Sequence, residues 1–392
     1  MTIELHFTAS ALEGMMNKKR GFDIQRIKWI FAALLAVLLP ALLGAADWQT
    51  EWEKTLAAAR KEGTLVVGIP ASAELRKAID SRFQEKFRIP LELFPSRGPE
   101  NVTRIINEYN AGIRYFDVFV AGGATPLTMA SSGAADELLL YMILPEVKDP
   151  KSWWGGHIWE DNVSTKRYIY AFQCYTSETF WYNTGQVQPN EIHSYDDLLN
   201  PKWKGRIGFL DPRNPGSGQN SWTFLWKVKG EEYLKKLAQQ DLLITQNQRQ
   251  IAEGLAKKKL AFTIGLSHYT YEPFLKAGLS KWISPIPRIK EGGQANNGSG
   301  VLTVVKNPPH PNGAKIFVSW LLGKEGQELY GKAMIQGTRR LDVDTQWLKE
   351  FGIEGCKDVM TVDDYYRLET HLESSVLKLR NPAIALATRI LK

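Results

Sequence analysis

Cysteine is scarce in this chain of 392 residues, which contains only Cys174 and Cys356. Neither cysteine lies in a C-x-x-C pair or at the spacing of metal ligands, which excludes a thiolate metal site and a disulfide-rich small fold. In an oxidising compartment the two thiols could pair, and two separate, packed thiols are an equally good interpretation.

The sequence also lacks the short motifs of common enzymes, including the Gly-x-Ser-x-Gly elbow, the His-Glu-x-x-His helix and the P-loop. It has no arginine-rich run, so its net charge of +7 indicates an anionic partner only weakly. We therefore expect no catalytic residues, no cofactor and no nucleic-acid partner. The alternative is a hydrolase or transferase on an α/β fold, which turnover of esters or phosphates would reveal.

The first 46 residues have the three parts of a secretory signal. An apolar run, Trp29–Leu43, is followed by Gly44-Ala45-Ala46, so cleavage is expected before Asp47. The basic residues that precede the run are Lys18, Lys19, Arg20, Arg26 and Lys28. The run is shorter than the ~20 residues of a spanning helix. We predict a periplasmic protein, with an uncleaved anchor as the alternative. The signal could equally begin at Met15 or Met16.

The exported part is long enough for two domains and alternates short apolar runs with amphipathic helices. Strands are predicted at residues 64–68, 91–94 and 117–123, with a helix after each. This alternation favours an α/β fold in which helices cover a mainly parallel sheet. Ligands of such sheets bind beyond the carboxyl ends of the strands.

A glycine-rich turn after another apolar run is the strongest candidate site. Ile207, Phe209 and Leu210 resemble the end of a buried strand, and a helical pattern follows Gly216-Ser217-Gly218. Glycines let the backbone approach a ligand closely, and the first N–H groups of a helix point outward. The helix dipole adds to these donors, so the turn suits an anionic oxygen, with the Ser217 hydroxyl as a further donor. The alternative is an ordinary helix cap.

Several motifs occur together in an order that resembles one family. They are Glu62-Gly-Thr-Leu-Val-Val67, Asp117-Val-Phe-Val120, Tyr182-Asn-Thr184, Leu198-Leu-Asn-Pro-Lys-Trp-Lys-Gly-Arg-Ile207 and Pro309-His-Pro-Asn-Gly-Ala314. From about residue 51 to 341, the chain resembles the periplasmic substrate-binding proteins of ABC importers. Its group is the one that takes up ferric iron, thiamine, polyamines, phosphonates and sugar phosphates.

The resemblance implies a two-lobed periplasmic-binding-protein fold of type II, with two mixed, mostly parallel sheets, flanking helices and a hinge. Lobe 1 would comprise residues 47–165 with 300–340, and lobe 2 residues 166–299 with 341–392. The partners would be a small anion (a carboxylate, phosphonate or phosphate) and the transmembrane permease subunits. The protein itself would be a monomer.

On this fold the candidate ligand-binding residues come from loops that face the cleft. They are Ser72, Arg97, Gly122, Gly123, Tyr175, Asp211, Gly216, Ser217, Gly218, Ser267, His268, Tyr269 and Tyr271. Arg97 could bind a carboxylate or phosphate bidentately. Ser72 is expected to cap a helix in any case, and Asp211 could orient the turn or bind a cationic group.

Ferric iron is the alternative ligand, because ferric-binding relatives carry an adjacent tyrosine pair where this chain has Tyr269 and Tyr271. Thr270 separates the two tyrosines, and alternate residues project differently from successive ones. A two-phenolate chelate is therefore not carried over directly. Tyr269, Tyr271 and His268 would be the iron ligands on this alternative.

Overall fold

The computed structural model describes most of the chain beyond the N-terminal segment. The described residues are 48–96, 98–122, 125–164, 166–176, 179–279, 282–286 and 289–391, without the side chains of 269, 272 and 279. The elements below belong to one compact unit, Glu51–Lys392. The predicted signal peptide, residues 1–46, lies outside the described residues. Among the helices that are described, none combines the length and the apolarity needed to cross a membrane.

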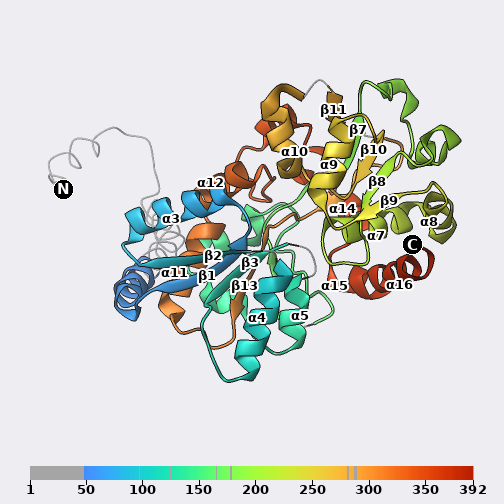
Figure 1. Cartoon of the computed structure of the whole chain (residues 1–392). Coiled ribbons are helices and arrows are strands. Elements are labelled where there is room, and N and C mark those ends of the chain that lie inside the picture. The colour runs from blue at the N-terminus through green and yellow to red at the C-terminus, as the bar shows by residue number, and fades with distance from the viewer. Residues whose placement is uncertain are drawn as a thin grey trace, which may run out of the picture. The chain divides into compact units, whose positions relative to one another are not determined.

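Six strands form the first sheet, in the order β2-β1-β3-β13-β4 with β5 beside β13 (Figure 1). Their bounds are β1 Leu65–Pro70, β2 Leu91–Ser96, β3 Val118–Ala121, β4 Ala135–Asp136, β5 Tyr170–Ala171 and β13 Val301–Val305. β1 pairs in parallel with β2 and β3, whereas β13 runs antiparallel to β3. The three predicted strands of this region are thus confirmed, in a mixed sheet.

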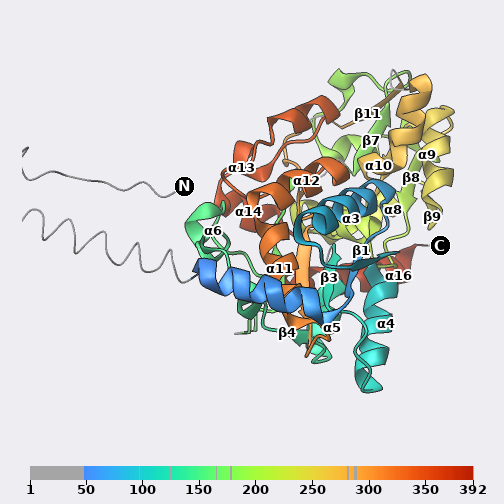
Figure 2. The same cartoon turned by 90° about the vertical axis from the view of Figure 1, so that its left-hand side faces the viewer.

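The helices of this region each bury one apolar face. Their bounds are α3 Ala73–Phe87, α4 Gly98–Asn110, α5 Thr125–Ser131, α6 Pro145–Lys148, α11 Pro311–Leu322 and α12 Lys324–Met334. In α3, Leu75, Ile79 and Phe83 are fully buried at four-residue spacing, as expected for one face of a helix. α3 and α12 lie side by side in Figures 1 and 2.

Five strands form the second sheet, in the order β11-β7-β10-β8-β9. Their bounds are β7 Phe180–Asn183, β8 Ile207–Leu210, β9 Leu243–Thr245, β10 Phe262–Ile264 and β11 Ile283–Pro285. β8 is parallel to both β9 and β10, and β7 is antiparallel to β10. The carboxyl ends of β8, β9 and β10 therefore share one edge.

Helices from two parts of the chain surround the second sheet. The first set is α7 Ser217–Lys229, α8 Glu231–Ala238, α9 Gln248–Ala256 and α10 His268–Phe274. The second set is α13 Cys356–Val359, α14 Val362–Leu368, α15 Glu373–Ser375 and α16 Asn381–Ile390, near the end of the chain. α16 packs against α7 (Figure 1), so the last residues complete the core around α7.

The extended stretch that the sequence predicts at residues 168–182 consists of three short strands. β5 joins the first sheet and β7 the second, while β6 (Tyr175–Thr176) pairs with β12 (Ala295–Asn296). Between β5 and β6, Cys174 forms a disulfide with Cys356, with their Cα atoms 5.4 Å apart. The pairing that the sequence left open is therefore present, and it fastens the end of the chain to a segment linking the sheets.

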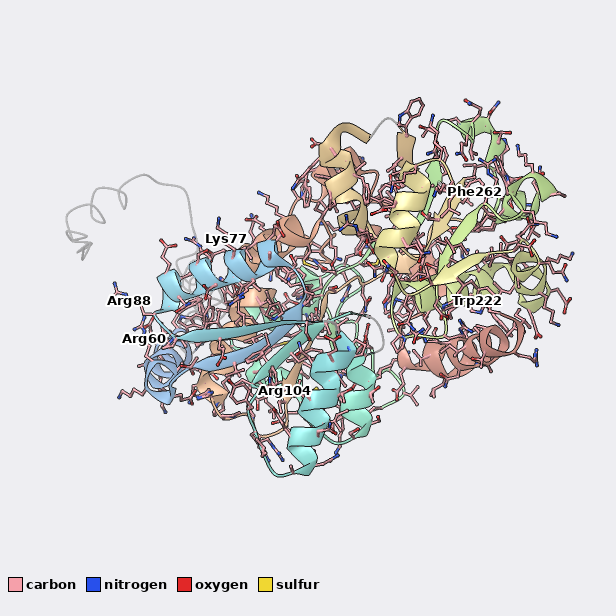
Figure 3. All side chains as sticks on the ribbon, in the orientation of Figure 1. Arg60, Lys77, Arg88, Arg104, Trp222 and Phe262 are labelled. Atoms are coloured by element: carbon pink, nitrogen blue, oxygen red, sulfur yellow. A yellow bond between two sulfur atoms is a disulfide. The ribbon has the colours of Figure 1, made fainter. Side chains whose placement is uncertain are left out.

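Each sheet has its own buried core. Trp222 and Phe262, labelled in Figure 3, belong to the cluster around the second sheet, and Phe83 to a separate cluster beside the first. β5 lies in the first sheet, although the predicted boundary assigns residue 170 to lobe 2. The division into lobes of residues 47–165 with 300–340 and of 166–299 with 341–392 stays a prediction.

Candidate functional site

The Gly216-Ser217-Gly218 turn lies between β8 and α7, as predicted. Gly216 is the N-cap, with φ of 142° and ψ of −164°, a backbone conformation that favours glycine. The N–H of Asn220 donates to the carbonyl of Gly216 at 3.0 Å and so begins the intrahelical hydrogen bonds. The N–H groups of residues 217–219 precede that bond and have no carbonyl partner within the helix.

The turn is packed tightly against the loop that follows β10. A Cβ atom added to Gly218 would lie 2.2 Å from the carbonyl oxygen of Leu210, and one added to Gly265 would lie 2.8 Å from the Cα of Gly218. Glycine is needed at both positions because two backbone segments meet there. The Ser217 hydroxyl donates to the carbonyl of Gly265. The prediction that this hydroxyl is a further donor for a ligand is therefore wrong for this conformation.

Asp211 orients the same turn through Arg213. Its two carboxylate oxygens accept from the Nε and Nη2 of Arg213, each at 2.8 Å, and one also accepts from the Arg213 backbone N–H at 3.0 Å. Burial raises the pKa of Asp211, but the bonds from Arg213 outweigh burial, so the pKa lies below its usual value. Since the carboxylate is neutralised within the turn, orientation is the role that the structure supports.

The segment after β10 carries four candidate residues, and it places them differently. Ser267 is partly buried and precedes α10, which begins at His268. The ring of His268 is mostly buried, with its centroid 5.9 Å from that of Trp181 and 5.2 Å from that of Phe351. The side chain of Tyr269 lies outside the described residues.

Tyr271 packs as a core residue in this structure, and its assignment to the binding site stays a prediction. The side chain is fully buried, its ring centroid lies 4.4 Å from that of Trp181, and its hydroxyl bonds to that of Thr263. Burial raises the pKa of the phenol, which opposes ionisation to a phenolate. Within the described ranges, no group of three or more His, Cys, Asp or Glu side chains is arranged to hold a metal ion.

A second group of candidates meets where β6 and β12 pair. A Cβ atom on Gly298 would lie 2.5 Å from the Tyr175 hydroxyl oxygen, and one on Gly122 would lie 2.1 Å from the Gly298 carbonyl oxygen. Tyr175 is itself buried, in a cluster with Leu348 and Ile353. The predicted Tyr175 and Gly122 thus share one location, and the core interpretation of Tyr175 holds in this conformation.

Two further polar residues lie at this location, and the sequence analysis missed both. The side-chain oxygen of Gln336 accepts from the N–H of Ser299 at 3.1 Å. The side-chain oxygen of Asn296 accepts from the N–H of Gly298 at 2.9 Å. Both are isolated polar residues without a motif, so only their position in the fold identifies them.

The remaining candidates lie apart from these two groups. The Ser72 hydroxyl accepts from the N–H of Leu75 at 3.1 Å and caps α3, which confirms its predicted structural role. Arg97 and Gly123 lie outside the described residues. A cavity of about 260 Å³ is lined by residues between 157 and 167, Tyr366 and Leu372, and no candidate residue belongs to its lining.

Comparison with known proteins gives a family and a fold. The sequence pattern of the family described as bacterial extracellular solute-binding protein matches residues 102–328. Iron uptake protein A1 of Synechocystis sp. is 27% identical over 160 residues, which are 37% of this chain and 43% of that protein. The match therefore spans less than half of the relative's length.

This chain also matches solved structures over nearly the whole length of those structures. Iron-bound HitA of Pseudomonas aeruginosa has a TM-score of 0.62 at 18% identity, covering 84% of this chain and 99% of its own. Trichodesmium IdiA (FutA) with iron and citrate has a TM-score of 0.61 at 20% identity, and the match covers 84% of this chain and 99% of that protein. AfuA of Actinobacillus pleuropneumoniae with fructose-6-phosphate has a TM-score of 0.60 at 19% identity, and the match covers 83% of this chain and 99% of that protein. At these identities the likeness concerns the fold alone, and it confirms the predicted two-lobed binding-protein class.

Proposed function

Because the chain belongs to the bacterial extracellular solute-binding proteins, we propose that it captures a small anion and delivers it to the membrane permease of an ABC importer. The anion carries a carboxylate, phosphonate or phosphate. The protein acts in the periplasm as a monomer, without catalysis. Its disulfide between Cys174 and Cys356 suits an oxidising compartment and so supports export.

The start of α7 is the feature that best supports an anionic ligand. It lies at the carboxyl end of β8, the edge at which ligands of α/β sheets bind. The N–H groups of residues 217–219 and the positive end of the helix dipole favour an oxyanion there. Arg97, which follows β2, is our proposed partner on the other lobe, and closure of the lobes would bring the two together.

Ferric iron is the second candidate ligand, favoured by the match to iron uptake protein A1. Of its three proposed ligands, Tyr271 is buried and bonded to Thr263. Iron binding would therefore have to rest on Tyr269 and His268, or on a bound anion. This is a weaker ligand set than the anion site at α7.

Native mass spectrometry of protein recovered from its own periplasm tests the proposal. We expect a retained small organic anion that is released on denaturation. A matched titration with ferric citrate, followed by visible absorbance, separates the two candidates. A strong charge-transfer band in the wild type that is lost in Tyr269→Phe, which deletes only the phenol oxygen, would favour iron.

A further inference from the structure

A buried arginine from the end of the chain contacts the first turn of α7. The Nη2 of Arg380 donates to the side-chain oxygen of Asn220 at 2.7 Å and to the carbonyl of Thr370 at 2.8 Å. Arg380 is only 5% exposed, and Asn220 is the residue whose N–H makes the first intrahelical bond of α7. The guanidinium is therefore hydrogen-bonded to the first turn of α7, at the residue where the intrahelical bonds begin.

A second side chain, that of Gln294, forms a hydrogen bond with the backbone of Asn220. The Nε2 of Gln294 donates to the carbonyl of Asn220 at 3.2 Å and to the Thr370 hydroxyl at 2.9 Å. Gln294 directly precedes β12, and Thr370 follows α14. Arg380 and Gln294 thus connect the same two residues, Asn220 and Thr370, and fix the first turn of α7 to two distant parts of the chain.

The position of this arginine costs free energy. A cation near a helix N-terminus opposes the helix dipole, and removing a guanidinium from water is unfavourable. Burial lowers the pKa of Arg380 to about 10, although Glu160 and Glu369 act in the opposite direction. The group therefore remains charged at neutral pH. The Nε of Arg380 and the Oε2 of Glu160 are buried without a hydrogen-bond partner, so packing alone does not account for this arrangement.

We propose that Arg380 is a positioning residue of the solute site: it fixes the first turn of α7, and so the direction of the N–H groups at residues 217–219. The inference rests on the proposed function, because it assigns the anion to that turn. The same contact makes the C-terminal segment, which lies outside the family match at residues 102–328, a part of the binding machinery.

Hydrogen exchange of the backbone amides in the full mature chain tests the positioning directly. Arg380→Met keeps an unbranched apolar stem and removes the guanidinium donors. We expect the amides of residues 220–222, the first hydrogen-bonded amides of α7, to exchange at least tenfold faster relative to the wild type, with a smaller change at residues 223–229. Equal acceleration along α7, or none, would overturn the proposal. Asn220→Leu, which removes the acceptor instead, should reproduce the result if Arg380→Met does not fold.

Two controls separate positioning from general loss of packing. Leu386→Ala opens the buried face of α16 without touching Asn220 or Thr370, and we expect it to affect the whole of α7 evenly. Arg380→Lys keeps a charged donor and should restore slow exchange at least partly. A lysine variant that behaves like Arg380→Met, while Leu386→Ala affects residues 220–222 selectively, would contradict the assignment.

Binding provides an independent measurement, with fructose 6-phosphate and citrate as the probes. For a probe that the wild type binds, Arg380→Met should weaken affinity at least tenfold, and Arg380→Lys should stay within threefold. Unchanged affinity in Arg380→Met would overturn the proposal. If the wild type binds neither probe, that failure counts against the anionic ligand, and the exchange experiment still decides the role of Arg380.

Discussion

The Ser217 hydroxyl donates a hydrogen bond to the carbonyl of Gly265, so the turn that begins α7 is fastened to the loop that follows β10. Both loops lie at the same edge of the second sheet, because β8 and β10 are parallel neighbours. The hydroxyl stabilises the turn through this bond, and the backbone N–H of the same residue is one of the donors that we propose for the anion. The two functions of Ser217 can be separated by mutation.

Ser217→Ala and Ser217→Pro form a matched pair. The alanine variant loses the bond to Gly265, so its stability should fall by about 1 kcal/mol while its affinity for the anion changes little. Proline suits the first position of a helix but has no N–H donor. Its affinity should fall by about one to two decades, at about 1.4 kcal/mol per decade. Calorimetric titration checks both, and equal dissociation constants for the two variants would contradict the backbone-donor account.

Gly218→Ala should destabilise the protein. The added Cβ would lie 2.2 Å from the Leu210 carbonyl oxygen, a backbone atom that cannot move without shifting β8. We expect a loss of about 1–3 kcal/mol or more, from overpacking, measured by guanidinium unfolding. Gly293→Ala is the control, because its Cβ would meet only ordinary contacts, the nearest at 3.6 Å from Thr176. Similar losses of unfolding free energy in the two variants would show that the close backbone approach at Gly218 does not require glycine.

The disulfide between Cys174 and Cys356 should contribute strongly to stability, because it closes a loop with a sequence separation of 182 residues. Replacing both cysteines with serine should cost about 2–5 kcal/mol. Guanidinium unfolding of the double variant, compared with wild type before and after reduction, measures this cost. Detection of two free thiols in the untreated protein would contradict the pairing.

His371 should make stability depend on pH in mildly acidic solution. Burial lowers its pKa to about 4, despite the opposing charge of Glu369, and its Nε2 lies 2.8 Å from the Tyr365 hydroxyl oxygen. An unfolded histidine titrates near ~6.5, so between about pH 6.5 and 4 only the unfolded chain takes up the proton. The free energy of unfolding should therefore fall by about 3 kcal/mol as the pH falls through this range.

His371→Gln removes the titrating group and keeps a polar side chain beside Tyr365. The difference in unfolding free energy between wild type and this variant should shrink or reverse as the pH falls from 6.5 to 4. Chemical unfolding at several pH values measures it. Parallel pH profiles for the two proteins would show that His371 is not buried in its neutral form.

Local patterns predicted much of the fold. The strands near residues 65, 91, 118 and 207 and the helices that follow them arise from apolar spacing and turn residues that act within a few positions. The split of residues 168–182 into β5, β6 and β7 was not predictable from such spacing, because each piece takes a different partner far along the chain. The pairing of Cys174 with Cys356 depends in the same way on where the C-terminal segment folds back.

The site was predictable in its backbone and less so in its side chains. The glycine turn at residues 216–218 followed from local sequence, since its conformation is set by its own residues. The direction of Tyr271 depends on how α10 packs against the second sheet, where Thr263 of β10 bonds to its hydroxyl and Trp181 of β7 contacts its ring. Arg380 lies 160 residues from its partner Asn220, so only the folded chain brings them together.

A thermal-shift screen of the mature protein against carboxylates, phosphonates and phosphates tests the central claim most directly. A ligand present at about 100 times its dissociation constant adds about 2.7 kcal/mol to the stability of the folded state. We therefore predict a clear rise in melting temperature with at least one organic anion, and a much smaller rise for Ser217→Pro with that same anion. A melting temperature that no anion in the library raises would contradict the account of an anion site at the start of α7.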